Sequence, residues 1–428
     1  MRLVVWIVGG LLLAPGAASA QHEHHPGAEM STAPLGVPAT REGSGTAWLP
    51  DESPMYMLGW HAGAWELDAM WNVFAQYLHD EGPRGFSQFG SVNWLMGMAR
   101  RPLGPGQLRG RVMFSLEPLT LGRCGYPDLL ATGETCHGEP LHDRQHPHDT
   151  FMELSTGYAV PVSSAVALDV YAALSGEPAL GPVAFPHRIS AMPNPIAPMT
   201  HHWLDSTHIS FGVVTAGVYG RKWKLEGSIF NGREPDEHRT DLDLGPLDSF
   251  SGRLWFQPTA QWSLQVSSGV LHEAEAGLGG APRSDVTRTT TSVTHHRLLG
   301  RRGVWATTAA WGMNDEHGHG TNAILVETVI DPDERNVVFA RAEAAQKSAA
   351  ALAISGGDEE ARWIGKVALG YVRQVSIGAG SGREFSFGLG VGVSVNAVPG
   401  AFEPAYGGRW PVGFSAFLST RPGRMAMR

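Results

Sequence analysis

The sequence predicts an all-β protein, a transmembrane antiparallel β-barrel of the outer-membrane type with about 16 strands, long extracellular loops and short periplasmic turns. Three observations predict this fold. Apolar and polar residues alternate with period two through most of the chain, and the connections between the alternating stretches switch between short and long. Charged residues make up only 17% of the chain, against 54 glycines and 14 tryptophans.

The alternation of apolar and polar positions is clearest in two stretches. In 383–396, Phe387, Leu389 and Val391 alternate with small or polar residues, and in 222–231, Leu225 and Ile229 alternate with charged and polar ones. Such strands have one face for lipid and one for a polar lumen. Marking every stretch of this kind predicts strands over 64–79, 88–99, 107–117, 149–160, 165–176, 206–220, 222–231, 249–258, 261–272, 285–297, 303–313, 322–330, 335–347, 361–374, 383–396 and 410–420.

The predicted connections differ in length from one end of the barrel to the other. Short turns are expected at 161–164, near Arg221, at Thr259–Ala260 and near Gly300, and loops at 118–148, 177–205, 232–248, 273–284 and 314–321. With a periplasmic N-terminus, the long loops face outward, and the first three of them are expected to narrow the lumen.

Tryptophans near the ends of the predicted strands are typical of the aromatic girdles at a membrane surface. The alternative is a soluble all-β protein with the same residues in its core. These tryptophans are Trp60, Trp65, Trp71, Trp94, Trp223, Trp255, Trp262, Trp305, Trp363 and Trp410.

The N-terminus predicts export. Residues 1–20 carry Arg2, a short apolar run and a small-residue Ala-Ser-Ala site, which is the pattern of a secretory signal peptide. We therefore expect a Gram-negative protein that crosses the periplasm to the cell outer membrane, with a flexible periplasmic tail over 21–55 and a barrel over 56–428. In this oxidising compartment the two cysteines, Cys124 and Cys136, are expected to form a disulfide.

Composition also limits the partners. The net charge of −9 argues against a nucleic-acid partner, because a broad basic face is missing. The expected partners are outer-membrane lipid and small solutes or metal ions, and a homotrimer is a further hypothesis.

Histidines and carboxylates gather in three predicted outer loops that follow one another in the chain. The blocks are HDRQHPHD (142–149), THHWLDSTHIS (200–210) and GREPDEHRTD (232–241). Pro147 favours an extended His146, so His146 and His148 are expected to project to the same side. Imidazole and carboxylate ligands suit Zn or Cu ions. The candidate metal ligands are His142, His146, His148, His201, His202, His208, His238, Asp149, Asp205 and Asp236, with His22, His24 and His25 as a separate group in the N-terminal tail.

Two other interpretations of this cluster stay open. Arginines lie among the acids, and hydrogen-bonded Asp/Arg/His networks commonly hold loops in place. A surface enzyme could use Asp205 with His208, or His208 with Ser206 or Ser210. However, the sequence has no G-x-S-x-G, H-E-x-x-H or Walker pattern, so the enzyme hypothesis has little support, and no cofactor other than a transition metal is expected.

On the blocks SPMYMLGWHAG, HDRQHPHD, THHWLDSTHIS and FNGREPDEHRTD, over residues 53 to about 270, the chain resembles an uncharacterised family of bacterial outer-membrane β-barrel proteins. This resemblance implies the fold and the location. A looser similarity is to the copper-resistance outer-membrane B proteins, which join a Met/His-rich tail to a barrel. The corresponding tail here is only HEHHPGAEM, at residues 22–30. Together these features predict a porin-like barrel concerned with transition-metal ions or small solutes, with a surface enzyme or a closed structural barrel as alternatives.

Overall fold

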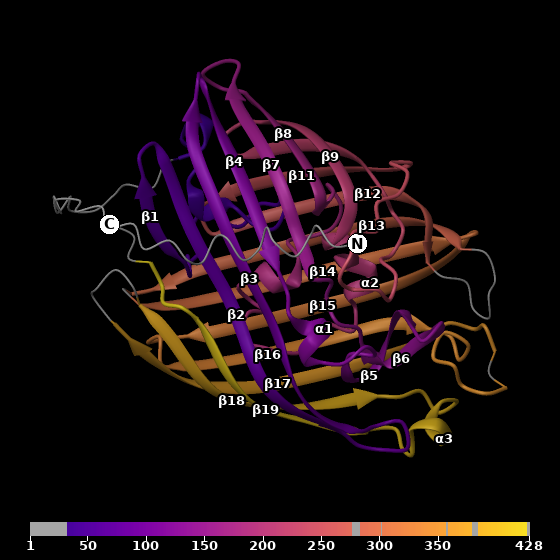
Figure 1. Ribbon diagram of the computed structural model, residues 1–428. Helices are drawn as coiled ribbons and strands as arrows, with labels where there is room; N and C mark the ends of the chain where they lie inside the picture. The colour runs from indigo at the N-terminus through magenta and orange to yellow at the C-terminus, as the bar shows by residue number, and fades with distance from the viewer. Residues whose placement is uncertain (1–31, 276–282, 301, 357, 379–383, 426–428) are drawn as a thin grey trace, which may run out of the picture. The chain divides into compact units, whose positions relative to one another are not determined.

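The chain forms a closed antiparallel β-barrel (Figure 1). The computed structural model describes residues 32–275, 283–300, 302–356, 358–378 and 384–425. The main sheet has 17 strands, and pairing of β19 (Val412–Pro422) with β2 (Trp65–Asp80) closes 16 of them into the barrel. The predicted signal peptide and the tail histidines His22, His24 and His25 lie outside the described residues.

Each predicted strand corresponds to one strand of the barrel. Between β2 and β19 these are β3 (Ser87–Leu103), β4 (Gly106–Phe114), β7 (Phe151–Pro161), β8 (Ala167–Gly176), β9 (Ser210–Tyr219), β10 (Trp223–Phe230), β11 (Ser249–Thr259), β12 (Trp262–Glu275), β13 (Ser284–Leu299), β14 (Gly303–Glu316), β15 (His319–Asp331), β16 (Asn336–Lys347), β17 (Arg362–Ile377) and β18 (Phe385–Ala397).

The remaining elements are short. Strand β1 (Leu58–Ala62) pairs with β2, and β5 (Tyr126–Cys136) pairs with β6 (Glu139–Gln145). The helices are α1 (Glu117–Thr120), α2 (His201–Leu204) and α3 (Glu403–Tyr406), and the 3-10 turns are η1 (Pro34–Gly36), η2 (Ala39–Arg41), η3 (Phe185–His187) and η4 (Ser206–His208). Among the described residues, no helix is long and apolar enough to cross a membrane.

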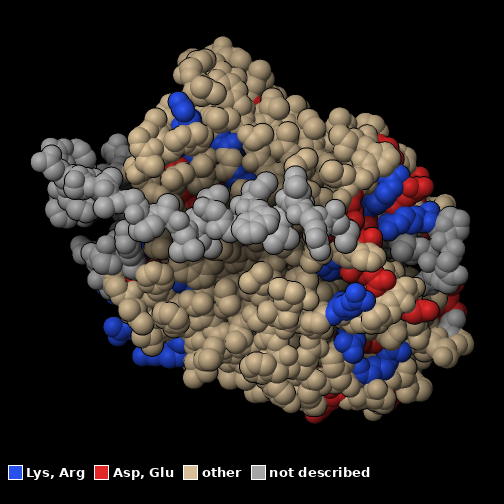
Figure 2. Space-filling view, viewed as in Figure 1, with Lys and Arg blue, Asp and Glu red and all other residues tan. Residues whose placement is uncertain are grey.

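The outer face of the barrel is apolar and the inner face is polar, as the period-two pattern predicts. On β10, Leu225 is 53% exposed while its neighbour Glu226 is 4% exposed. Figure 2 shows the result on one side of the molecule, where the middle is largely free of charged residues and the charges gather toward the end that carries the long connections. This outer face suits the hydrocarbon of a membrane.

Connections at the two ends of the barrel differ in length, which confirms the predicted sorting. At one end they span 104–105, 162–166, 220–222, 260–261, 300–302, 332–335 and 378–384. At the opposite end, called here the long-loop end, they span 81–86, 115–150, 177–209, 231–248, 276–283, 317–318, 348–361 and 398–411. The predicted short loop around 314–321 is shorter than expected, because β14 and β15 continue their pairing up to Glu316 and His319 and leave only a tight turn.

Two of the predicted girdle tryptophans lie in the lumen instead. Trp94 on β3 and Trp255 on β11 are buried, and they share the inward parity of Met96 and Arg253 on the same strands. Trp60, Trp363 and Trp410, by contrast, are well exposed, as the girdle prediction requires.

Residues 32–57, called here the lumenal segment, contact inward-facing side chains of both the early and the middle strands. Glu42 accepts a hydrogen bond from Arg100 on β3 (3.2 Å), and Gln257 on β11 donates to the carbonyl of Leu49 (2.6 Å). Trp48 is buried. The predicted flexible periplasmic tail over 21–55 is therefore wrong for residues 32–55, because polar groups of the barrel wall bind the backbone and side chains of this segment.

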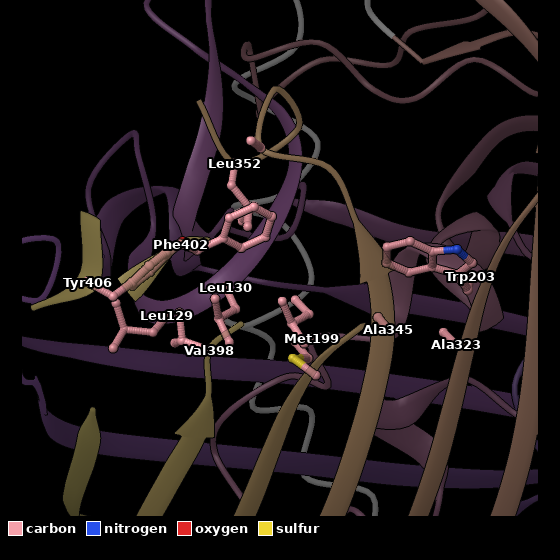
Figure 3. Close-up of a cluster of buried hydrophobic side chains, with 12 residues drawn as sticks. Leu129, Leu130, Met199, Trp203, Ala323, Ala345, Leu352, Val398, Phe402 and Tyr406 are labelled. Atoms are coloured by element: carbon pink, nitrogen blue, oxygen red, sulfur yellow. The ribbon is translucent and has the colours of Figure 1, made fainter. Parts of the chain in front are cut away.

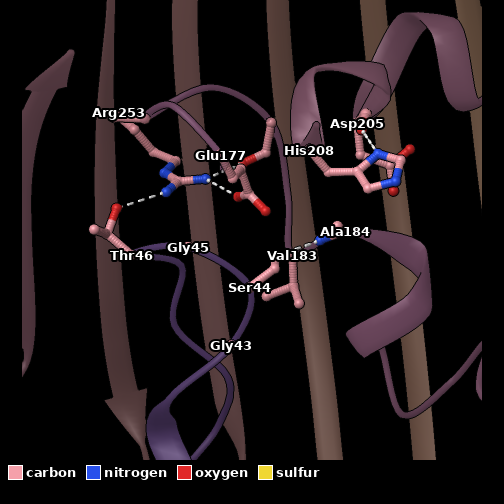
Figure 4. A network of polar contacts seen from close by, with 12 residues as sticks. Gly43, Ser44, Gly45, Thr46, Glu177, Val183, Ala184, Asp205, His208 and Arg253 are labelled. Carbon is pink, nitrogen blue, oxygen red and sulfur yellow. Dashed lines mark hydrogen bonds and ion pairs between the residues drawn. The ribbon is translucent and has the colours of Figure 1, made fainter. Parts of the chain in front are cut away.

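Two long connections also lie inside the barrel: inner loop A (115–150) and inner loop B (177–209). Asp128 of loop A is ion-paired with Lys366 on β17, and Arg188 of loop B with Glu327 on β15 (2.7 Å). Figure 4 shows how one wall residue joins two internal segments: Arg253 donates to Glu177 of loop B (3.0 Å) and to Thr46 of the lumenal segment (3.1 Å). In the third predicted constriction, 232–248, only Gly232 and Arg239 are buried, and the other residues are half-buried or exposed.

The long-loop end carries a hydrophobic cluster that joins four connections (Figure 3). Leu130 comes from loop A, Trp203 from loop B, Leu352 from 348–361 and Phe402 from 398–411, and all are buried. The predicted disulfide between Cys124 and Cys136 is formed at the first strand of the loop A hairpin. Loop A is thus held by apolar packing as well as by a covalent bond.

Candidate metal centre

Three buried histidines from the two inner loops converge. Potential ligand atoms of His146, His201 and His202 all lie within 4.8 Å of one another. His146 follows β6 at the end of loop A, and the other two begin α2 in loop B. The distances between ring centroids are 6.1 Å for His146 and His201, 5.8 Å for His146 and His202, and 5.2 Å for His201 and His202. We call these three residues the imidazole centre.

Two further histidines extend the imidazole centre on one side. The His208 ring lies 5.1 Å from His201 and 5.3 Å from His148, measured between centroids. Phe185 packs against all three of these rings. As predicted, His146 and His148 project into the same cluster on either side of Pro147.

Each imidazole is oriented through its Nδ1 atom. His201 Nδ1 lies 2.9 Å from the Asp205 carboxylate, and His202 Nδ1 lies 2.9 Å from Glu234. For His146, the nearest partners of Nδ1 are the Pro147 carbonyl (3.2 Å) and Glu134 (3.3 Å). Carboxylates and carbonyls in these positions fix the tautomer with a proton on Nδ1, which leaves Nε2 as the metal-binding atom.

The same arrangement recurs in the two flanking histidines. His148 Nδ1 lies 2.9 Å from Glu117, and His208 Nδ1 lies 2.8 Å from the Asp205 carbonyl. The Nε2 atoms of His146, His148 and His208 are buried and have no hydrogen-bond partner among the described residues. Buried polar atoms normally find a partner, so unpartnered imidazole nitrogens indicate a place for a ligand.

Gly133 makes room for the imidazole centre. Its φ of +123° is unfavourable for other residues, and a Cβ atom there would lie 2.1 Å from the His202 ring. Loop A therefore approaches His202 more closely than any side chain at residue 133 would permit.

Burial and neighbouring charges set the protonation of this cluster. Burial lowers the pKa of His146 and His208 well below the ordinary value, and it lowers the pKa of His201 to about 4 although Asp205 opposes this. For His148, burial is outweighed by Glu117, so the pKa is raised. Most of the cluster is thus neutral near pH 7, which is the form of imidazole that binds metal ions.

The acids of the cluster are ion-paired with arginines or hydrogen-bonded to its histidines. Burial disfavours the charge of Asp205, but Arg188, 2.5 Å away, and His201 hold the pKa of Asp205 well below its usual value. Asp149 pairs with Arg239 at 3.4 Å, and Arg239 also binds Glu134. Asp149 and Asp205, both predicted as ligands, therefore act here as partners of arginine and histidine.

Three predicted ligands lie away from the imidazole centre. His142 on β6 is near Arg84 (2.8 Å) and Asp143 (3.3 Å). His238 is exposed and pairs with Asp236 at 3.2 Å. Asp236 also belongs to an exposed acidic group with Asp241 and Asp243. The connection 231–248 contributes Glu234 and Arg239 to the cluster instead of the predicted histidine.

His208 is not paired with the Asp205 carboxylate, Ser206 or Ser210, as the predicted catalytic pairs would require. His208 Nδ1 contacts the backbone carbonyl of Asp205 and not its carboxylate, which binds His201 and Arg188. Ser206 Oγ accepts a hydrogen bond from Arg288, and Ser210 Oγ donates to the Thr207 carbonyl. The hydroxyls of both serines are thus bound to other partners than His208, and these described residues do not pair a nucleophile with a base.

Sequence reasoning missed the three glutamates and His187. Glu117, Glu134 and Glu234 lie in the same long connections as the histidines, and an acid in a histidine-rich loop is the signal that could have included them. His187, in η3, lies with its Nε2 atom 3.4 Å from the sulfur of Met113.

The closed antiparallel barrel, the apolar outer face and the polar, segment-filled interior define a porin-like barrel of the outer membrane. No family model matches the chain, and no curated protein matches it.

Solved structures of similar fold are outer-membrane proteins. OmpF of Salmonella typhi in complex with daunomycin aligns with a TM-score of 0.50 at 8% identity, over 85% of this chain and 100% of that chain. An anion-selective porin from Comamonas acidovorans aligns with a TM-score of 0.48 at 10% identity, over 83% and 99% of the two chains. The outer-membrane channel DcaP of Acinetobacter baumannii aligns with a TM-score of 0.43 at 10% identity, over 85% and 99%. At these identities the similarity shows the fold alone.

Proposed function

We propose that this porin-like barrel handles a transition-metal ion of the Cu²⁺ or Zn²⁺ class, which it binds inside the lumen at His146, His201 and His202. The observation that carries the proposal is the convergence of these three buried imidazoles, each with Nδ1 held by a carboxylate or carbonyl. Neutral imidazole nitrogen is a preferred ligand of both ions. His148 and His208 are close enough to extend the ligand set as the ion moves.

Filling of the lumen supports handling of an ion over free passage of larger solutes. The lumenal segment and both inner loops occupy the interior and are bound to wall residues such as Arg100, Arg253 and Glu327. An ion that enters from the long-loop end meets the imidazole centre between loops A and B. In this proposal, small solutes pass only through the part of the lumen that the lumenal segment and the two inner loops do not occupy.

Metal analysis of the purified protein in detergent tests the imidazole centre. The test is made in a chain whose tail histidines His22, His24 and His25 are replaced by alanine, so that the tail contributes no binding. In this background the pair His146→Gln and His202→Gln is compared with the matched pair His142→Gln and His238→Gln, which alters predicted ligands outside the centre. Each preparation is stripped by chelation and titrated with Zn²⁺ and Cu²⁺.

We expect the first pair to weaken metal binding on the order of tenfold or more and the second pair to leave it unchanged. Heat-modifiable migration in gels shows that both variants keep the barrel. Equal metal content in the two variants would contradict the proposal and favour a purely structural network. The mass of the detergent-solubilised protein separately tests the predicted homotrimer.

A further inference from the structure

A row of methionine side chains lies on the inner wall of the barrel, apart from the imidazole centre. Met70 on β2 is directly opposite Met96 on β3, and Met96 is directly opposite Met113 on β4. Residues in such pairs have Cβ atoms only about 5 Å apart. Met98, two residues further along β3, points to the same side. Three neighbouring strands thus present four thioethers to the lumen.

The internal segments add methionines from the opposite side. Met55 and Met57 come from the lumenal segment, and Met192 comes from inner loop B. With the wall residues they surround a cavity. Of the 14 methionines in the chain, six line this one cavity, namely Met55, Met57, Met70, Met96, Met98 and Met192. We call it the thioether cavity.

The charged groups at the thioether cavity are already paired. Arg100 and Arg111 line it, together with Glu42, to which both are ion-paired (3.2 and 3.4 Å). Arg100 also binds Glu66 and Asp68 on β2. Neither guanidinium therefore faces the cavity as an unpaired cation, and a small cation that enters is not opposed by an uncompensated positive charge.

His187 connects the thioether cavity to the imidazole centre. It lines the thioether cavity, and it also lines a smaller cavity together with Met113, Met152 and His208. His208 in turn packs against His201 of the imidazole centre. Nitrogen and sulfur ligands thus follow one another from the imidazole centre through His208, Met113 and His187 to the thioether cavity.

From this arrangement we infer that the thioether cavity is a second metal site, which binds a soft monovalent cation of the Cu⁺ or Ag⁺ class. Thioether sulfur is a soft ligand that favours such ions and has little affinity for Zn²⁺. The inference is separate from divalent-ion binding at the imidazole centre, since its ligands come from different residues. Methionine also fills irregular space in protein cores, and this role is one outcome of the test.

Silver binding tests the inference, because Ag⁺ is stable in air. Purified full-length protein in chloride-free detergent buffer is loaded with silver nitrate, desalted and analysed for bound metal. Met96→Leu with Met98→Leu alters the cavity at nearly constant side-chain volume, so the barrel should fold. The matched control is Met199→Leu with Met313→Leu, since neither residue lines the cavity.

We expect the wild-type protein to retain Ag⁺ with sulfur neighbours in its X-ray absorption spectrum. The Met96 and Met98 variant should bind Ag⁺ on the order of tenfold more weakly, while the control binds it normally. Zn²⁺ titration of the same variants separates the two proposals, because the loss of thioethers should leave Zn²⁺ binding intact.

Three results would overturn the inference. The wild-type protein could retain no Ag⁺, the two methionine variants could bind it equally, or the bound ion could have nitrogen neighbours and disappear in the His146→Gln and His202→Gln variant. The second result would make the methionines packing residues only. The third would place the ion at the imidazole centre.

Discussion

Replacing Arg188 by methionine removes a buried ion pair that attaches inner loop B to the barrel wall. The Arg188 side chain is almost completely buried between Asp205 of its own loop (2.5 Å) and Glu327 on β15 (2.7 Å). Its Nη1 atom also donates to the Val183 carbonyl (3.0 Å). The variant Arg188→Met therefore leaves two buried carboxylates without their shared cation.

The expected loss of docking free energy depends on the partners that the two carboxylates keep in the variant. Glu327 retains Arg341 at 3.1 Å, and Asp205 retains the backbone N–H of Phe185 at 2.8 Å. Breaking a buried ion pair costs about 3 to 5 kcal/mol. Because each carboxylate keeps one partner, we expect Arg188→Met to weaken docking of loop B by about 3 kcal/mol, at the lower end of this range. A change of that size raises the population of the undocked loop about a hundredfold.

Hydrogen exchange followed by mass spectrometry measures this population directly. Amides within 177–209 should exchange about a hundredfold faster in Arg188→Met than in the wild-type protein, while those of the β-strands should not change. Arg335→Met, at an exposed position in a short turn, is the control. Unchanged exchange in 177–209 would refute the reasoning, because it would show that apolar packing alone holds loop B.

Two further predictions concern the lumenal segment and its partners. Trp48→Ala should cost about 3 to 5 kcal/mol of packing, because Trp48 is buried against Arg41 and Tyr219. The loosened segment should raise single-channel conductance in planar bilayers, and equal conductance would argue against its role as a plug. Burial raises the pKa of Glu177 from 4.5 to about 7, so the folded protein holds this proton more tightly than the unfolded chain. The resulting stabilisation is present below about pH 4.5 and is lost as the pH rises through about 7. The free energy of unfolding should therefore differ less between pH 5 and pH 8 in Glu177→Gln than in the wild-type protein, by about 3 kcal/mol at most. Denaturant titrations at the two pH values measure this difference. If the difference is as large in the variant, other groups cause the pH dependence.

The strands could be predicted because lipid and lumen impose opposite chemistry on alternate residues. Leu225 and Glu226 are adjacent in sequence and face opposite environments, so the pattern is visible in the sequence itself. The same alternation could have placed the buried tryptophans correctly. Trp255 lies two residues from both Arg253 and Gln257 on β11, so it faces the lumen as they do. Proximity to a strand end was a weaker signal than parity.

The interior could not be predicted in the same way, because its contacts join distant parts of the sequence. The lumenal segment is rich in glycine, proline and serine, which is typical of a flexible tail, and it is ordered by partners such as Arg100 and Gln257. Among the histidines, His146 and His238 occur in similar motifs, yet only His146 reaches the centre. Which one does so depends on the path of each loop, and local sequence does not encode that path.

The position of the lumenal segment also limits the order in which the barrel can be assembled. The segment contacts β3 through Glu42 and β11 through Leu49, so it crosses the interior from the wall beside the seam of β2 and β19 to the wall opposite that seam. Before β2 and β19 pair, the segment can enter the barrel interior from the side. After they have paired, it can enter only by threading through one end of the barrel. If the first described residues settle before the last strand pairs, the segment is spared that threading step, and filling of the interior is coupled to closure of the barrel.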